Sequence, residues 1–360
     1  MFDIDTFLKQ TVAMGASDMH LHVGEYPAVR RDGAMIKINM PRITDEDMKQ
    51  ICHDMAPEHL KDSIGSQMDI DFAYEIENCS RFRVNISRQM GKYAVVIRAV
   101  SCNIKTLEEL FLPETLHEFE TMNNGLVLIT GPTGSGKSTT MAAIIDHINS
   151  TAQKHIITIE DPVEYVFTSK KSIISQRQLL VDTPSFADGV KYALRQDPDV
   201  ILVGEIRDRE TVTTALRAAE TGHLVFSTIH TNNAIETVNR IVNMFNPADR
   251  PFVRYQLAQV LRGTISQKLI PLASGTGRRP AAEILVATST IQDLIVKNEL
   301  EQVYDLVKKG SYNNMVTLNT SLYNLIKDGS VKEEVAVAAS NNPNELKQML
   351  RGVYHGTKQD

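Results

Sequence analysis

Gly131-Pro132-Thr133-Gly134-Ser135-Gly136-Lys137-Ser138 is the stretch that decides the fold of this chain. It matches the phosphate-loop pattern in full, follows an apolar run at residues 126–130 and precedes a helix-like segment at 139–148. The glycines let successive backbone N–H groups converge on phosphate oxygens beside a helix amino terminus. The alternative is a glycine-rich turn that merely connects a strand to a helix, which the match in its context disfavours. The stretch therefore predicts a nucleotide site.

Each side chain of this loop has an expected task toward ATP. Lys137 is expected to reach the β and γ phosphates, and Ser138 to give its hydroxyl to a Mg²⁺ ion that bridges them. Thr139 is expected beside the α phosphate. The predicted nucleotide-binding residues are Pro132, Thr133, Gly134, Ser135, Gly136, Lys137, Ser138 and Thr139.

Outward from the loop, strand-like apolar runs alternate with helix-like segments. The runs lie at residues 126–130, 156–160, 200–203 and 224–228. This alternation is typical of a parallel sheet with crossover helices. We therefore predict an α/β nucleotide-binding domain over residues 120–360, with a helical carboxyl-terminal region over about 284–352 and a frayed tail from 353.

The chain before the loop has a different pattern. Residues 1–102 combine an amphipathic start with alternating strand-like stretches such as residues 81–86, which predicts a small α+β domain. Residues 103–119 show little periodicity and contain Leu-Pro-Glu, so we expect an interdomain connection there.

Carboxylates follow two of the predicted strands, where doubly wound sheets bind their ligands. Glu205 follows the run 200–203 and is expected to orient Mg²⁺ or its waters. Glu160, Asp161 and Glu164 follow the run 156–160. We favour Glu164 over Glu160 as general base for the attacking water because it lies beyond the proline turn. For Glu160 or Asp161 alone, a solvated strand end or a helix cap is an equal alternative.

The histidines give weaker signals. His223 and His230 flank the run 224–228, and their separation by a strand disfavours joint metal binding. His230 follows the strand on the nucleotide side, so it is a candidate γ-phosphate sensor, with a structural histidine as the alternative. His20 and His22 share a strand face but have no third ligand nearby.

Composition excludes several classes of protein. A 360-residue chain with 42% hydrophobic residues can bury more than one core, and its apolar runs are too short to cross a bilayer. Cys52, Cys79 and Cys102 are isolated, which disfavours a disulfide framework or a zinc knuckle. The net charge of −6 argues against nucleic acid as the main partner. With an acidic amino terminus that does not resemble a secretory signal, we expect a cytoplasmic protein.

Four ordered motifs resemble those of the secretion-type ATPases, and most closely the type IV pilus retraction ATPases of the PilT and PilU kind. They are the phosphate loop, the Ile-Glu-Asp-Pro-Val-Glu-Tyr run at 159–165, the run at 194–208 that ends in Gly-Glu-Ile-Arg-Asp, and a histidine box at 219–231. The Ser-Asp-Met-His-Leu stretch at 17–21 is also similar, so the resemblance covers nearly the whole chain.

This resemblance implies a PAS-like first domain, a RecA-like second domain and a ring of six identical subunits with ATP between the two domains. Arg83 and Arg98 match the family's amino-terminal arginines that approach the phosphates on domain closure. Closure and opening around ATP would then drive motion. The implied partner is a PilC-like platform protein of the inner membrane, to which this chain would be peripheral, together with a paralogous retraction ATPase.

Three functional hypotheses remain open. The short chain without any Cys-x-x-Cys favours pilus retraction, since extension and type II secretion ATPases usually carry a further amino-terminal domain and a four-cysteine zinc insert. The family's Ala-Ile-Arg-Asn-Leu-Ile-Arg-Glu stretch aligns with residues 290–297, which keep the apolar positions and lose the charged pattern. An accessory PilU-like ATPase is therefore an alternative, and a RecA-like nucleic-acid motor is a second one that the acidic charge disfavours.

Overall fold

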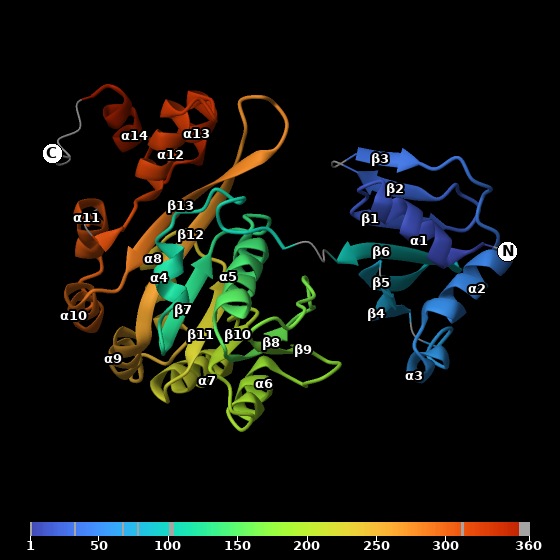
Figure 1. The fold of residues 1–360 in the computed structure, drawn as a ribbon, viewed down its shortest axis with the longest axis horizontal. Helices are drawn as coiled ribbons and strands as arrows, with labels where there is room; N and C mark the ends of the chain where they lie inside the picture. The colour runs from blue at the N-terminus through green and yellow to red at the C-terminus, as the bar shows by residue number, and fades with distance from the viewer. Residues whose placement is uncertain are drawn as a thin grey trace. The chain divides into compact units, whose positions relative to one another are not determined.

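A computed structural model of the chain describes residues 2–31, 34–66, 68–77, 79–100, 104–310 and 313–352 (Figure 1). The chain divides into two compact units, one of residues 1–103 with 164–166 and one of residues 104–163 with 167–360. The predicted boundary after residue 102, the thiol of Cys102 and the predicted frayed tail from 353 lie outside the described residues. Cys52 and Cys79 are free thiols.

The first unit contains a six-stranded antiparallel sheet in the order β3-β2-β1-β6-β5-β4. Its strands are β1 (Asp18–His22), β2 (Ala28–Arg31), β3 (Ala34–Lys37), β4 (Asp69–Ile76), β5 (Ser80–Gln89) and β6 (Lys92–Val100). Its helices are α1 (Ile4–Ala13), α2 (Asp45–Met55) and α3 (Glu58–Lys61). The predicted α+β character and the strand predicted at 81–86 are confirmed.

Only one face of this sheet is apolar. Along β5 the side chains of Phe82, Val84 and Ile86 are buried in the same core as residues of α1 and α2. A strand places alternate residues on opposite faces, so Arg81, Arg83 and Asn85 share the other, polar face. Two of the helices named above begin with side-chain caps, Asp3 at the start of α1 and a capping box of Thr44 and Asp47 at the start of α2.

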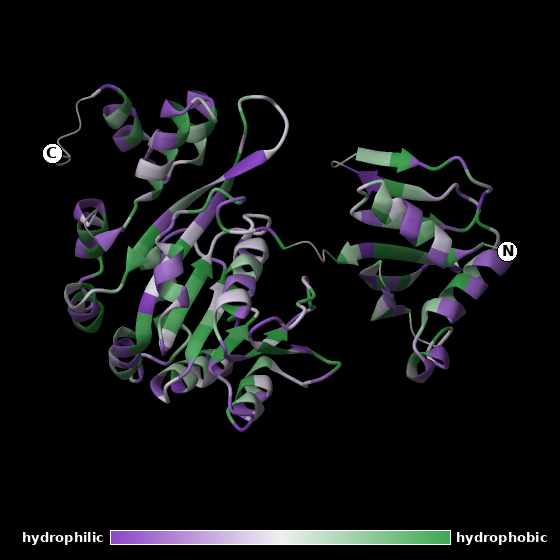
Figure 2. Ribbon diagram, in the orientation of Figure 1, coloured by the Kyte–Doolittle hydropathy of each residue, from purple (hydrophilic) through white to green (hydrophobic). Residues whose placement is uncertain are grey.

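The second unit contains a seven-stranded sheet in the order β13-β12-β7-β11-β10-β8-β9. All neighbouring strands are parallel except β12 and β13, which are antiparallel. The strands are β7 (Gly125–Thr130), β8 (His155–Glu160), β9 (Ile173–Gln178), β10 (Val200–Val203), β11 (Leu224–Ile229), β12 (Leu261–Pro271) and β13 (Arg278–Val286). The four predicted strands are confirmed, and Figure 2 shows how hydrophobic this central sheet is.

Helices cover both faces of this sheet. Val127 and Ile129 of β7 face a core with α4 (Leu116–Glu120) and α5 (Lys137–Thr151). Leu126 and Leu128 face the opposite core. The helices of that second core are α6 (Phe186–Ala193), α7 (Arg209–Glu220), α8 (Ala234–Asn243), α9 (Arg250–Val260), α10 (Ser289–Lys297) and α11 (Glu301–Lys309).

A smaller helical cluster completes the unit. The helices α12 (Leu318–Lys327), α13 (Glu333–Ala339) and α14 (Pro343–Leu350) bury their apolar faces together with Ile270 of β12 and Ala281 of β13. Every helix in the described part of the chain is too short or too polar to cross a lipid bilayer.

Two segments differ from the sequence-based expectation. Residues 104–119, expected as an interdomain connection, belong to the second unit, where Leu107, Leu112, Leu116 and Phe119 are buried. The helical region expected from about 284 begins later, because β13 continues to Val286 and α10 starts at Ser289. In both segments the local sequence periodicity is weak, and tertiary packing determines the structure that forms.

Candidate functional site

Three parallel strands carry the predicted site to one edge of the second unit's sheet. The phosphate loop follows β7, His230 follows β11, and Glu205 follows β10 by one residue. The strand order places β11 between β7 and β10, so the strands that lead to the loop and to Glu205 are about 10 Å apart. The register pairs Thr130 with Ile229 and Val203 with Ser227, so β10 ends two residues before the level of Thr130 and Ile229, and Glu205 follows two residues beyond Val203.

The backbone of the phosphate loop requires glycine at defined positions. Gly131, Gly134 and Gly136 have φ of 146°, 77° and 90°, values that residues with a Cβ rarely adopt. A Cβ at Gly131 would lie 2.3 Å from the carbonyl oxygen of Gln267. The loop therefore combines left-handed backbone with close packing against β12. Gly136 caps α5, which places the helix amino terminus directly after the loop.

The Lys137 ammonium lies over the loop's own backbone. Its Nζ donates to the carbonyl oxygens of Gly131 at 2.8 Å and Pro132 at 3.1 Å. The residue is buried, whereas Pro132, Thr133 and Gly134 are exposed. Ser138 and Thr139, the next residues of α5, are half-buried. A cation surrounded by backbone dipoles at a helix amino terminus is suited to phosphate.

Strand β12 supports the loop from the side. Thr140 of α5 donates its hydroxyl to Oε1 of Gln267 at 2.8 Å. Thr130, the last residue of β7, donates its hydroxyl to that of Ser266 at 2.9 Å. All four of these side chains are buried. Because buried polar groups cost free energy unless they are paired, these bonds fix the start of α5 and the end of β7 relative to β12.

Glu205 is the centre of an ionic network. Its Oε1 lies 3.2 Å from Nε2 of His230, and its Oε2 accepts from Arg207, 2.8 Å from Nε and 2.7 Å from the nearer terminal nitrogen. Arg207 also reaches Asp161 Oδ2 at 3.5 Å. The hydrogen bond to Glu205 raises the pKa of Arg207 above its ordinary value. This network joins the residues that follow β8, β10 and β11.

The segment that carries Glu205 is held from both sides. The Gly204 N–H donates to the carbonyl of Ile159 on β8, and the Ile206 N–H donates to the carbonyl of Thr228 on β11. The Thr228 hydroxyl in turn donates to the carbonyl of Gly204 at 2.6 Å. Glu205 is thus presented from rigid strands, with a side chain that is 18% exposed.

The two candidate bases have different surroundings. Oε1 of Glu160 accepts from the Thr158 hydroxyl at 2.6 Å and from Nε2 of Gln176 on β9 at 3.1 Å. Glu164 is exposed and groups with the first unit. The two carboxylates therefore have different surroundings, with Glu160 engaged by its own sheet.

In the first unit, Arg83 and Arg98 are direct neighbours across β5 and β6, on the polar face of the sheet. Arg98 Nε lies 2.8 Å from Asp18 Oδ1, and Arg83 Nε lies 3.7 Å from Asp71 Oδ1. Desolvation opposes ionisation of Asp18, but the hydrogen bonds from Arg98 and Ser17 prevail and lower the pKa of its carboxyl. Arg98 is therefore committed to a strong local pair, and Arg83 only to a weak one.

The other three histidines considered from the sequence, His223, His20 and His22, make local contacts. His223 precedes β11 and its Nδ1 lies 3.0 Å from the carbonyl oxygen of Ala218, so it has a local structural bond at the end of the strand opposite to His230. His20 and His22 have parallel rings on one face of β1, with centroids 6.5 Å apart.

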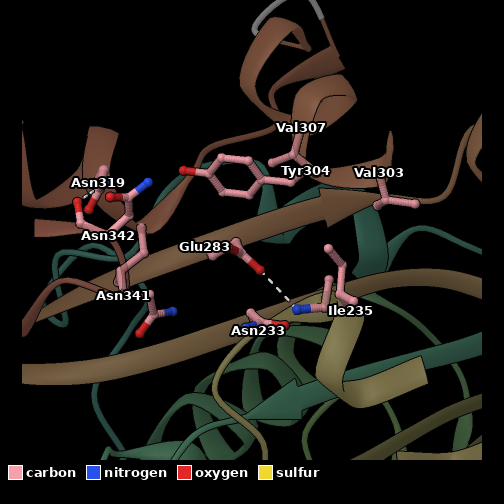
Figure 3. A pocket seen from close by; sticks show the side chains of 11 residues that line it. Asn233, Ile235, Glu283, Val303, Tyr304, Val307, Asn319, Asn341 and Asn342 are labelled. Atoms are coloured by element: carbon pink, nitrogen blue, oxygen red, sulfur yellow. Dashed lines mark hydrogen bonds between the residues drawn. The ribbon is translucent and has the colours of Figure 1, made fainter. Parts of the chain in front are cut away.

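A cavity of about 240 Å³ lies elsewhere in the second unit, among β13, α8, α11 and α12 (Figure 3). The carboxylate of Glu283 points into it and accepts a hydrogen bond at 2.9 Å from the Ala234 N–H, the first residue of α8. Tyr304 and Asn341 also line it. None of the predicted nucleotide-binding residues lines this cavity.

Sequence reasoning missed Arg207 and Gln267 as parts of the site. Arg207 stood in the quoted run at 194–208, and its place two residues after Glu205 was the available signal. Gln267 gave no signal, because its contact with the loop depends on β12 being the neighbour of β7.

Known proteins resemble the chain over almost its full length. The family model for type II/IV secretion system proteins matches residues 2–336. A type IV pilus retraction ATPase, PilT of Pseudomonas aeruginosa, is 40% identical over 334 residues, which are 93% of this chain and 97% of that protein. A type IV pilus ATPase, PilU of the same organism, is 36% identical over 97% of this chain and 91% of that protein.

Solved structures give the same picture. A crystal structure of the pilus retraction motor PilT with bound ADP superposes with a TM-score of 0.91 at 46% identity, covering 97% of this chain and all of that chain. The ATPase DotB of Legionella pneumophila superposes with a TM-score of 0.78 at 28% identity, over 97% of this chain and 95% of that chain.

Proposed function

We propose that this chain, which belongs to the type II/IV secretion system protein family and is an ATPase, powers the retraction of type IV pili. The observation that carries the proposal is the convergence of the phosphate loop, Glu205 and His230 at one sheet edge. The similarity to PilT over 93% of the chain supports retraction as the work that hydrolysis drives.

In the proposed site, residues 132–139 hold the phosphates of ATP. Lys137 leaves the carbonyls of Gly131 and Pro132 for the β and γ phosphates, since an anion outcompetes neutral acceptors for an ammonium. Ser138 and, through water, Glu205 hold Mg²⁺, whose charge offsets that of the transferring phosphoryl group. His230 lies 3.2 Å from Glu205. It is therefore placed to sense the γ phosphate while it contacts Glu205, the carboxylate that holds the ion through water.

Glu164 is our proposed general base. The bonds of Glu160 to Thr158 and Gln176 support this order, because a carboxylate that accepts two hydrogen bonds is a weaker base. Glu164 is exposed, so it keeps acceptor capacity for a water.

We further propose a PAS-like role for the first unit, with Arg83 and Arg98 approaching the phosphates when the two units close around ATP. Arginine suits this task because its planar, permanently charged group stabilises the charge of the γ phosphate in the transition state. The acting form is a homo-hexamer in the cytoplasm, bound to the inner membrane through a PilC-like platform protein. Nucleic acid has no part in this function.

An accessory role is the second candidate. The lost charge pattern at 290–297 favours it, and the 36% identity to PilU, slightly below the 40% to PilT, is compatible with it. In that role the chain would bind ATP and act with a paralogous principal retraction ATPase.

The deciding experiment measures Mg²⁺-dependent hydrolysis by the purified chain, with oligomer size by light scattering. We expect Lys137→Ala and Glu205→Gln to abolish hydrolysis, and the control Lys171→Ala, at an exposed lysine of the same unit, to leave it unchanged. Full hydrolysis by Lys137→Ala would refute the site. Glu164→Gln should bind ATP without hydrolysing it. Normal turnover by Glu164→Gln, together with an inactive Glu160→Gln, would identify Glu160 as the base instead.

Expression in a strain that lacks its own retraction ATPase separates the two candidate functions. Restored twitching by this chain alone supports the motor. Restoration only together with a second retraction ATPase supports the accessory role, and strong stimulation of hydrolysis by DNA or RNA would overturn both.

A further inference from the structure

Away from the nucleotide site, two histidines and a buried glutamate converge between α4 and α5. Nδ1 of His117 lies 2.8 Å from Oε2 of Glu120, and Nδ1 of His147 contacts the same oxygen. The two rings lie with centroids 4.6 Å apart. One ligand atom from each of the three residues fits within a mutual distance of 4.8 Å.

The carboxylate at the centre is poorly satisfied by protein alone. The Glu120 side chain is 3% exposed, and its second oxygen, Oε1, is buried without a hydrogen-bond partner among the residues that the structure describes. An ionised carboxylate in such a place costs several kcal/mol unless positive charge compensates it. A cation bound among these three side chains would supply such a charge.

The outer contact of His117 specifies which ring nitrogen is available. Nε2 of His117 lies 3.0 Å from Oε1 of Glu108, so a proton on Nε2 is shared with that carboxylate. A neutral imidazole then has its lone pair on Nδ1, directed at Glu120 and His147. A carboxylate on the outer nitrogen of a ligand histidine is the arrangement that orients metal-binding imidazoles.

We propose that His117, His147 and Glu120 bind one zinc ion, with Glu108 as the positioning residue behind His117. Two imidazole nitrogens and one carboxylate oxygen suit zinc, and leave a fourth position for water, while Mg²⁺ and Ca²⁺ prefer oxygen ligands throughout. Tetrahedral zinc separates its ligand atoms by about 3.3 Å, so small side-chain rotations open the cluster.

The site would join two parts of the second unit that matter for its mechanics. His117 and Glu120 belong to α4, at the end of the segment 104–120 that leads from the first unit. His147 belongs to α5, ten residues and about 15 Å along the helix from Lys137. Zinc would fasten this segment to the helix that begins at the phosphate loop, at a place separate from the Mg²⁺ of ATP.

The test uses the full chain without a histidine tag, stripped with EDTA and free of nucleotide. Zinc is titrated against a chromophoric chelator, and Co²⁺ is used as a spectroscopic substitute. We expect one zinc per chain, a visible absorption of tetrahedral Co²⁺, and a higher melting temperature with zinc. His147→Gln should lose all three effects, whereas the control His53→Gln, at an exposed histidine of α2, should keep them.

Glu108→Gln keeps all three ligands and guards against a folding defect in the other variant. We expect it to weaken zinc binding by about 10- to 100-fold, as loss of an outer carboxylate typically does. Zinc affinity that stays the same in both His147→Gln and Glu108→Gln, or the absence of stoichiometric binding by the unaltered chain, would overturn the proposal.

Discussion

The buried carboxyl of Glu283 makes the stability of the second unit depend on pH. Burial raises the pKa of Glu283 to about 7, against the partial effects of the Ala234 N–H and the charge of Lys268. Lys268 is itself held by the carbonyl of Ala339 and by Asn341, and burial lowers its pKa. Tyr304, from α11, lines the same cavity. Desolvation therefore dominates at Glu283.

The sign of the effect follows from the raised pKa. The unfolded chain releases this proton near its ordinary value of 4.5 and the folded chain near 7, so the contribution of Glu283 is full below 4.5 and is lost as pH rises through 7. The total is about 3 kcal/mol. We expect Glu283→Gln to be more stable than the unaltered chain at pH 8, and this difference to shrink to less than about 1 kcal/mol at pH 5.

Urea unfolding at pH 5 and pH 8 measures this difference. Glu299→Gln, which changes an exposed glutamate, is the matched control and should follow the unaltered chain at both values. The same pH dependence in Glu283→Gln as in the unaltered chain would contradict the assignment.

Among single residues, those of the phosphate loop were predictable because their function depends on the spacing of residues that are close together in the sequence. The glycines, Lys137 and Ser138 need only their own backbone and the following helix. Gln267 was not predictable, because its partner Thr140 lies on an element far away in the sequence. Arg207 and Glu120 were predictable only in part, since each also contacts a residue more than twenty positions away, Asp161 and His147 respectively. His117 and Glu120 left only a faint signal, a His-x-x-Glu spacing that places both on one turn of a helix.

At the scale of elements, α10 shows which part of an altered motif matters for packing. Ile291, Leu294 and Ile295 are buried in the core of the second unit. Gln292 is half-buried and Val296 and Lys297 are exposed, so the positions that lost the family's charge pattern lie away from the core. The changes therefore affect a surface and leave the helix itself intact.

We expect the combined changes Gln292→Arg, Val296→Arg and Lys297→Glu to increase pilus retraction by this chain alone, because they restore the charges of the retraction motif. ATP hydrolysis should be unchanged, and the free energy of unfolding should stay within about 0.5 kcal/mol. Twitching zones and hydrolysis rates provide the measurement. Gln302→Arg adds charge to exposed surface on the neighbouring α11 and should have no effect. Unchanged twitching in the combined variant would remove this helix from the coupling to retraction.

Some strands of the second unit could not be predicted from the sequence. The four apolar strands were predictable from their runs, but β9 and β12 were not, because Gln176, Ser266 and Gln267 interrupt their apolar pattern. In the fold these polar side chains bond Glu160, Thr130 and Thr140. Hydrogen bonds to these partners offset the cost of removing the polar side chains from water. The partners lie far away in the sequence, so periodicity alone could not identify the strands.

For the whole molecule, the proposed closure brings arginines of the first unit to the phosphates. The two candidates, Arg83 and Arg98, differ in their local contacts. Arg98 holds Asp18, whose side chain is 10% exposed, so Arg98→Ala leaves a nearly buried carboxylate short of a partner at a cost of about 1–3 kcal/mol. Arg83 has a longer contact with the more exposed Asp71. Arg83→Ala is therefore the variant that tests closure without disturbing the fold.

We expect Arg83→Ala to lower kcat by about 10²- to 10³-fold, at or below the lower end of what a transition-state arginine contributes, because Arg98 remains. The affinity for ATP and the melting temperature should be unchanged, and six copies of the 40.2 kDa chain should still assemble into particles of about 241 kDa by light scattering. Arg81→Ala removes an arginine from the same face of β5 and should keep full kcat. If Arg83→Ala hydrolysed ATP at the normal rate in intact rings, the first unit would have no part in the chemistry, and its six-stranded sheet would serve assembly or partner binding instead.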